Sequence, residues 1–189
     1  PKVQVEMEIT SRRVDVLHDE IDLAIRTNFE ANEDSSIVVR DVIKTTHCLV
    51  ASPELLQGRQ IRHVTELNDF PSIVLGTQKQ SYQWHLHHLQ HQDQMDIALQ
   101  PRIKSSDLSG AYYAALDGLG IADLPFLTVL EDIQAGRLIH VLPDWCSNLG
   151  TVQLVYASRK GQGVLMEKLI EHLIEGLRAY APDQQGYKI

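Results

Sequence analysis

Apolar and polar residues follow two kinds of pattern along this chain, and the first kind predicts β-strands. Residues 3–9 alternate between apolar and polar, which is the period of a half-buried strand. Residues 21–26 instead form a compact apolar run, as expected of a strand covered on both faces. Further strands are predicted at residues 37–42, 48–51, 72–75, 97–103, 120–125, 138–142 and 151–157.

Between these strands the apolar residues recur at helical spacing. Residues 108–119 show this spacing clearly, and residues 164–180 predict a longer amphipathic helix that closes the chain. Strands that alternate with helices predict an α/β architecture. Shorter helices are predicted at residues 52–56, 64–67 and 128–134, and a very polar helix at residues 82–91.

The composition is that of an ordinary globular protein. The 189 residues are 43% hydrophobic and 22% charged, which is enough for one core or for two small lobes. No apolar run is long enough to cross a bilayer, and no signal peptide is recognised. The chain begins at Pro1 without a methionine and enters the first strand at once, so we expect a fragment of a longer protein.

Acidic side chains outnumber basic ones, and this excess argues against nucleic-acid binding by the chain itself. The formal net charge is -8, and such a surface repels a phosphate backbone. Cys48 and Cys146 stand far apart and form no disulfide framework, which fits a reducing cytoplasm. We expect Cys48 to be buried in a strand and Cys146 to lie in a loop. Redox sensing is an alternative that needs an accessible thiolate and usually a resolving partner.

Four segments, in a fixed order, carry a family pattern over nearly the whole chain. Residues 17–26 lead into an Asp-hydrophobic-Ala-hydrophobic-Arg strand, and residues 48–56 contain Leu-Val-Ala-Ser-Pro. Residues 114–125 end a helix and continue as Gly-Leu-Gly-Ile-Ala-x-Leu-Pro, and residues 136–145 follow with Gly-Arg-Leu-Ile-His-Val-Leu-Pro-Asp-Trp. Together these segments resemble the effector-binding domain of LysR-type transcriptional regulators.

This resemblance implies an α/β fold like that of the type II periplasmic binding proteins. Two lobes with mixed or parallel sheets, flanked by helices, would be joined by two crossover strands and would enclose a small-molecule cleft. We expect residues 1–71 and 151–189 to form lobe one, and residues 72–150 to form lobe two. Lobe one would lack its first strand and helix, and the family's N-terminal winged helix-turn-helix would be absent from this chain.

The resemblance also implies a function, which is ligand sensing in the control of transcription. A small effector, of which an anionic one fits best, would bind between the lobes. The domain would act in the cytoplasm, away from membranes, as a homodimer or homotetramer, and would reach DNA only through the missing N-terminal domain. The helix at residues 52–56 is expected at the dimer interface. The alternative is a periplasmic solute-binding protein of the same fold, which would need an export signal.

Residues that follow the predicted strands are the candidates for effector binding. Ligands of α/β folds gather at strand carboxyl ends and helix amino ends, where free backbone N–H groups favour anions. An arginine at such a place can pair with a carboxylate through two hydrogen bonds. The candidate effector-binding residues are Arg26, Thr27, Thr77, Gln78, Ser105, Ser106, Asp107 and Phe126.

These candidates have purely structural alternatives as well. Ser106 and Asp107 would be ordinary helix caps in that interpretation. Thr77 and Gln78 would form a turn. Phe126 would be a core aromatic, which is the more common role of a buried ring.

The histidine-rich stretch at residues 85–91 raises a metal site as a further alternative. His87 and His91 stand four positions apart and could face one ion. No cysteine or close glutamate completes the ligand set, although Asp93 is near, so a solvated helix face is favoured. Sensing of pH by these histidines is another alternative. Nucleophile-elbow, phosphate-loop and dinucleotide motifs are absent from the sequence, so we expect no catalytic residue, no cofactor and no metal.

Overall fold

The computed structural model describes residues 3–10, 12, 14–28, 36–76, 82–157 and 163–180. The strands are β1 (Ala24–Asn28), β2 (Ile37–Ala51), β3 (Ser72–Leu75), β4 (Gln83–His88), β5 (Gln94–Ala98), β6 (Pro101–Ser105), β7 (Ile121–Pro125), β8 (Ile139–Val141), β9 (Trp145–Cys146) and β10 (Leu149–Ala157). The helices are α1 (Pro53–Leu56), the 3-10 helix η1 (Val64–Asp69), α2 (Leu108–Leu116), α3 (Phe126–Gln134) and α4 (Val164–Tyr180).

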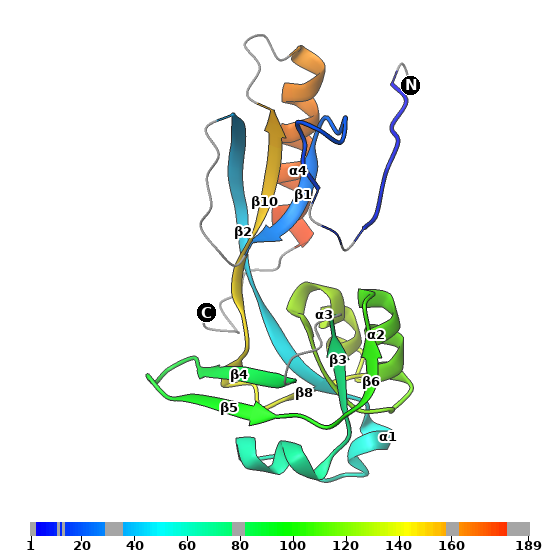
Figure 1. The fold of residues 1–189 in the computed structure, drawn as a ribbon, viewed down its shortest axis with the longest axis vertical. Helices are drawn as coiled ribbons and strands as arrows, with labels where there is room; N and C mark the ends of the chain where they lie inside the picture. The colour runs from blue at the N-terminus through cyan, green and yellow to red at the C-terminus, as the bar shows by residue number, and fades with distance from the viewer. Residues whose placement is uncertain are drawn as a thin grey trace.

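These elements form two bodies that Figure 1 shows one above the other, joined by β2 and β10. The first body contains β1, most of β10, the beginning of β2, and α4. The second body contains the end of β2 and the elements between β2 and β10. The largest sheet has the order β1-β10-β2-β7-β3-β6, with β8 also beside β2, and β5-β4-β9 form a smaller sheet. The sheet is antiparallel from β1 to β7 and parallel from β7 to β6, so the architecture is mixed α/β.

The strand β2 belongs to both bodies, and its alternating side chains build two separate cores in the second body. Cys48 and Val50 point to one face, where α2 and α3 cover them, because successive side chains of a strand point to opposite sides. Leu49 and Ala51 point to the other face and pack under α1, η1 and the small sheet. In the first body, α4 buries Ile170 against the β2 and β10 strands, as its amphipathic pattern predicts.

The chain passes between the two bodies inside strands, and this affects where a lobe boundary falls. The sequence pattern placed residues up to 71 in lobe one, whereas Leu56, Val64 and Leu67 pack with Trp84 and Leu86 in the second body. The difference has a physical reason, because β2 continues from one body into the other without a turn. When the chain crosses from one body to the other within a single strand, no turn residues mark the crossing in the sequence.

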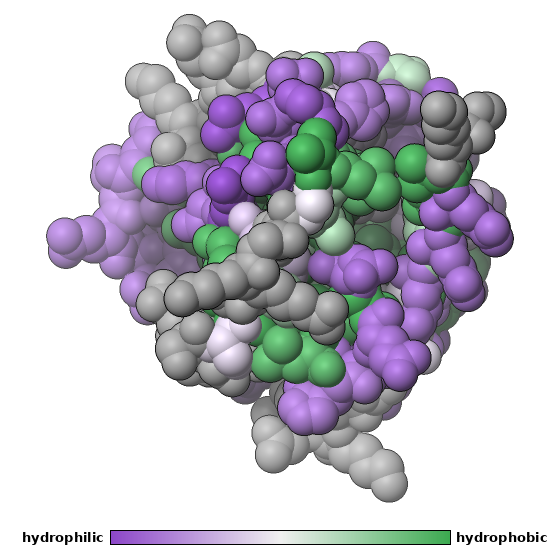
Figure 2. Space-filling view, turned by 90° about the horizontal axis from the view of Figure 1, so that it is seen from above, coloured by the Kyte–Doolittle hydropathy of each residue, from purple (hydrophilic) through white to green (hydrophobic). Residues whose placement is uncertain are grey.

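The run at residues 3–9 is extended but pairs with no strand among the described residues, so the strand predicted there is not formed. An extended segment becomes part of a sheet only when a neighbouring strand pairs with its backbone N–H and C=O groups. Figure 1 shows this dark blue run apart from β1. Its apolar side chains are exposed, and Met7 and Ile9 are 78% and 89% accessible. Figure 2, which looks down on this end of the molecule, shows apolar side chains at the surface between polar ones.

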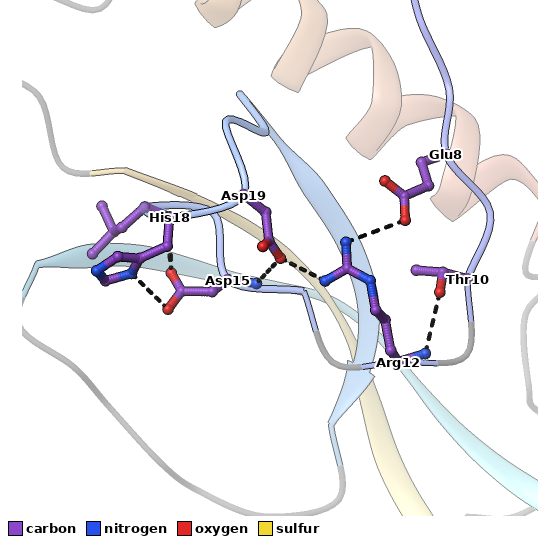
Figure 3. A network of polar contacts seen from close by, with 7 residues as sticks. Glu8, Thr10, Arg12, Asp15, His18 and Asp19 are labelled. Atoms are coloured by element: carbon purple, nitrogen blue, oxygen red, sulfur yellow. Dashed lines mark hydrogen bonds and ion pairs between the residues drawn. The ribbon is translucent and has the colours of Figure 1, made fainter.

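Ion pairs hold the turn that follows this run in place (Figure 3). Arg12 donates to Asp19 at 2.7 Å and to Glu8 at 3.3 Å. His18 Nδ1 lies 2.9 Å from Asp15 Oδ2. These side chains are largely exposed, so solvent and salt screen the pairs and they contribute little to stability.

The helix predicted at residues 82–91 is wrong, because most of this stretch, Gln83–His88, forms the strand β4. Trp84 and Leu86 are buried while His85 between them is exposed, which is the alternation of a strand. Across the hairpin, His85 Nδ1 lies 2.7 Å from Asp96 Oδ1 on β5. The polar histidines masked the period-two pattern of the two apolar residues. None of the helices in the described ranges has the length and apolar character needed to span a membrane.

Candidate functional site

The strand directions bring carboxyl ends of both bodies to the junction between them. The strand β1 is antiparallel to β10, and β10 is antiparallel to β2, so β1 runs in the direction of β2, toward the second body. The strands β7, β3 and β6 run opposite to β2, so their carboxyl ends point toward the first body (Figure 1). The carboxyl ends of these strands therefore face one another across the junction.

The register along β2 gives the offset of these ends along the strand direction, while the order β1-β10-β2-β7 separates them by three strand spacings, about 14 Å, across the sheet. Asn28, the last residue of β1, pairs with Thr151, which in turn pairs with Lys44 on β2. Pro125, the last residue of β7, pairs with His47 on β2. Lys44 and His47 are three residues apart on one strand, which corresponds to about 10 Å.

The sequence places Arg26 and Thr27 at a strand exit, but β1 runs from Ala24 to Asn28, so Arg26 is its middle residue and Thr27 its last but one. Arg26 is half-buried and pairs with Gln153 on β10. Gln153 Nε2 donates to Asp41 Oδ1 on β2 at 2.7 Å, so Arg26, Gln153 and Asp41 form a row across three strands. Thr27 is exposed. The guanidinium of Arg26 thus lies near the junction and has the geometry to bind a carboxylate.

Ser105, Ser106 and Asp107 lie together where β6 leads into α2. Asp107 Oδ2 accepts a hydrogen bond of 3.1 Å from Gly110 N, so the helix-cap interpretation is confirmed for Asp107. Ser105 Oγ donates to Asp107 O at 2.7 Å and accepts from Asp107 N at 3.1 Å, so it stabilises the same turn. Ser106 is exposed and makes no side-chain hydrogen bond to the residues that the structure describes. Of these three side chains, that of Ser106 is the most available to a ligand.

Phe126 begins α3 directly after the carboxyl end of β7. Its side chain is buried in the core under α2 and α3, and its ring centroid lies 6.0 Å from that of His140. Burial lowers the pKa of His140, which favours the neutral ring. Phe126 therefore packs in the core at the place where the predicted site begins.

Thr77 and Gln78 lie outside the described residues. The strand that precedes them, β3, ends beside the turn described above, because Gly76 N donates to Ser105 O at 2.8 Å. Gly76 has a φ of +130°, a conformation that side chains rarely adopt. The prediction for Thr77 and Gln78 stays a prediction.

The centre of the junction contains residues that the sequence patterns did not single out. Thr45 and Thr46 are buried on β2, and Asp123 on β7 accepts a hydrogen bond from Ser147 at 2.6 Å and lies 3.4 Å from His47 Nδ1. The sequence predicts two strands, at 37–42 and 48–51, with a polar gap between them. That gap was the available signal, because polar residues inside one continuous strand mark a functional or strained place.

The two cysteines are buried near this centre. Burial raises the pKa of the Cys48 thiol, and the Asp123 carboxylate raises it further. Burial also raises the pKa of Cys146, which lies in β9, so the loop predicted for Cys146 is wrong. Among the described residues, no group of three or more His, Cys, Asp or Glu side chains is placed to hold a metal ion. Neither thiol has the accessible, electropositive surroundings of a reactive cysteine.

Comparisons with known proteins agree with this geometry. The family model of the LysR substrate binding domain matches residues 1–178. The HTH-type transcriptional regulator PtxR of Pseudomonas aeruginosa is 28% identical over 178 residues, which are 94% of the chain and 56% of PtxR. The chain spans about half the length of the curated relatives it matches.

Solved structures share the fold. Full-length AphB, a virulence activator of Vibrio cholerae and member of the LTTR protein family, has a TM-score of 0.76 at 24% identity, over 93% of the chain and 59% of AphB. The regulatory domain of CrgA, a LysR-type regulator from Neisseria meningitidis, has a TM-score of 0.71 at 22% identity, over 86% of the chain and 78% of that domain. At these identities the likeness establishes the fold, which confirms the predicted fold class.

Proposed function

Because the chain belongs to the family of LysR substrate-binding domains, we propose that it is the ligand-sensing part of a longer transcriptional regulator. A small effector would bind at the junction of the two bodies and shift their relative orientation. The observation that carries this proposal is that the carboxyl ends of β1 and β7 point toward the junction from opposite bodies, with an offset of about 10 Å along the strand direction. Effector binding can shift the orientation only by its different affinity for the two arrangements.

The residues at the junction favour a small anionic effector. Arg26 supplies a guanidinium from the middle of β1, and Lys44 lies on β2 at the level of Asn28, the last residue of β1. The amino end of α2, beside Ser106, presents backbone N–H groups and the positive end of the helix dipole. These groups are suited to a carboxylate on the effector.

The rest of the regulator is part of the same proposal. The matched relatives are named as HTH-type regulators, which supports transcriptional control over solute transport or catalysis. We expect action in the cytoplasm, homo-oligomers, and contact with DNA through a part of the longer protein that this chain lacks. Among the described residues β1 is an edge strand of the large sheet, and a further strand of lobe one would pair there. The chain would pass from lobe one to lobe two inside β2 and return to lobe one at the start of β10.

A thermal-shift screen of small metabolites tests the effector site. A specific ligand at about 100 times its Kd stabilises the folded state by about 2.7 kcal/mol. For a chain of this length such a gain raises Tm by roughly 5–10 °C. We expect small carboxylates among the compounds that raise Tm.

Variants then locate the binding site. Arg26→Ala and Ser106→Ala should weaken a confirmed ligand at least about tenfold, the effect of losing about 1.4 kcal/mol. Arg102→Ala is the matched control, because Arg102 is exposed near the amino end of β6, away from the junction. Full binding by both site variants, or an equal loss in the control, would place the ligand elsewhere.

A further inference from the structure

We propose that Asp123 is the hinge anchor of this molecule, a carboxylate whose side-chain contacts link both crossovers where they meet the second body. This inference rests on the proposed function only in assigning the movement of the bodies to effector binding. Asp123 stands at the position that the family pattern Gly-Leu-Gly-Ile-Ala-x-Leu-Pro leaves open. The anchor is therefore a feature of this chain.

The carboxylate of Asp123 makes contact with each crossover. It projects from β7, which belongs to the second body, and its side chain is 13% exposed. Asp123 Oδ2 accepts a hydrogen bond of 2.6 Å from Ser147 Oγ, and Ser147 lies two residues before the crossover strand β10. The same oxygen lies 3.4 Å from Nδ1 of His47, which is on the other crossover strand, β2. One oxygen thus contacts the chain both where β2 enters the second body and where the chain leaves it before β10.

The two crossovers are also bonded to each other at this level. Asn148 O accepts from His47 N at 3.0 Å and from Thr46 Oγ1 at 2.8 Å. Asn148 Nδ2 donates to Ser147 Oγ at 3.2 Å. These contacts link five residues into one group, which we call the anchor cluster: Thr46, His47, Asp123, Ser147 and Asn148.

The backbone next to the anchor cluster has the features of a bending point. Thr45 on β2 pairs with Gly150 on β10, and a glycine inside a strand weakens the ladder there. The pairing of β10 with β2 then shifts register between Val152 and Gln153, as at a β-bulge, where strands bend. Beyond this shift, the hydrogen bond between Gln153 and Asp41 begins the first body.

The hinge therefore lies between the anchor cluster and the Gln153–Asp41 bond. On one side Asp123 fixes both strands to the second body, and on the other the strands belong to the first body. Loss of the carboxylate should free the crossovers at their attachment to the second body and add a second bending point. The orientation of the two bodies should then become less defined, while each core stays intact.

A distance measurement between spin labels on the two bodies tests this inference in the whole chain. Gln134→Cys on α3 and His172→Cys on α4 place one label on each body, and both positions are exposed. Cys48 and Cys146 are buried and should not take the label in the folded protein. In Asp123→Ala the width of the distance distribution should roughly double, as expected when a hinge gains freedom.

The matched control is Asp96→Ala. Asp96 also pairs with a histidine, at 2.7 Å from His85 Nδ1, but it lies exposed in the β4–β5 hairpin. This variant removes the same charge and should leave the distribution unchanged. A purely structural role for Asp123 would lower Tm in Asp123→Ala without widening the distribution, and that result would overturn the proposal. Equal widening in the control would also overturn it.

A milder variant keeps the test decisive if Asp123→Ala does not fold. Ser147→Ala removes the short hydrogen bond to Asp123 Oδ2 but leaves the His47 contact, so it should widen the distribution by less than Asp123→Ala. A folded Ser147→Ala with the distribution of the unmodified chain would count against the anchor. These measurements need no effector, so a failed ligand screen would weaken the proposed function without changing their outcome.

Discussion

Tyr112 on α2 donates a hydrogen bond of 2.7 Å to the carboxylate of Asp132 on α3 and so ties together the two helices that cover one face of the second body. The Asp132 side chain is 4% exposed and also pairs with Arg137 Nε. A hydrogen bond to a charged group contributes about 1.5–3 kcal/mol, and its loss leaves a buried carboxylate less satisfied. Tyr112→Phe should therefore lower the free energy of unfolding by an amount in this range, measured by urea denaturation.

The neighbouring residue supplies the control for this experiment. Tyr113 is 63% exposed and loses only a solvated hydroxyl in Tyr113→Phe, so its unfolding midpoint should stay close to that of the unmodified chain. Equal midpoints for the two variants would show that the Asp132 bond contributes nothing in solution.

The same bond predicts an unusual tyrosine titration. The hydrogen bond to Asp132, together with burial and the carboxylate charge, raises the pKa of Tyr112 from 10.0 to about 12. By ultraviolet absorbance, one of the six tyrosines should ionise late, and this late component should vanish in Tyr112→Phe. Below the unfolded pKa both states hold the proton, so the stabilisation is complete. Between the two pKa values the unfolded state loses its proton first, so stability falls as pH rises.

The sequence predicts most helices and strands of this fold because their local patterns agree with their tertiary surroundings. The helix at residues 164–180 forms as its amphipathic pattern predicts. The exceptions are places where a partner decides the structure. Residues 3–9 have a strand pattern but no strand beside them, and β4 buries Trp84 and Leu86 among histidines that suggested a helix.

Likewise, only part of the candidate site can be predicted from the sequence. The carboxyl end before Phe126 can be found from the sequence, because its local pattern marks the end of β7, whereas the strand predicted to end at Arg26 continues to Asn28. The meeting of His47, Asp123 and Ser147 cannot, because it depends on the antiparallel register of β2 with β7 and on the return of β10. No local period places three such distant residues together.

Asp107 and Ser106 should separate a structural role from a ligand-binding role. Asp107→Ala removes the cap of α2 and should destabilise the chain by about 1 kcal/mol. Ser106→Ala should leave stability within about 0.5 kcal/mol, since its hydroxyl is exposed. Chemical denaturation measures both changes. A large loss of stability in Ser106→Ala would mean that this hydroxyl stabilises the turn, and its assignment to the effector site would then lose its basis.

The two thiols should resist modification in the folded chain. Burial raises the pKa of both Cys48 and Cys146, so little thiolate forms at neutral pH and the sulfur atoms are covered. A chromogenic disulfide reagent should react with fewer than about one thiol in ten under native conditions, and with both in denaturant. Rapid labelling of Cys146 in the native chain would reopen redox sensing, and Cys146→Ser would then identify the reacting thiol.

The chain alone should bind DNA poorly at physiological salt. Its 25 acidic and 17 basic residues give a formal net charge of -8, and binding to the phosphate backbone depends on replacing counterions with lysine and arginine side chains. An electrophoretic mobility shift assay with random and promoter-derived duplexes should show no complex at micromolar chain concentration. Fusion of a helix-turn-helix domain should restore binding with the steep salt dependence of phosphate contacts. A salt-sensitive complex with the chain alone would instead reveal a basic patch strong enough to overcome the net charge, and DNA contact could then no longer be assigned only to another part of the regulator.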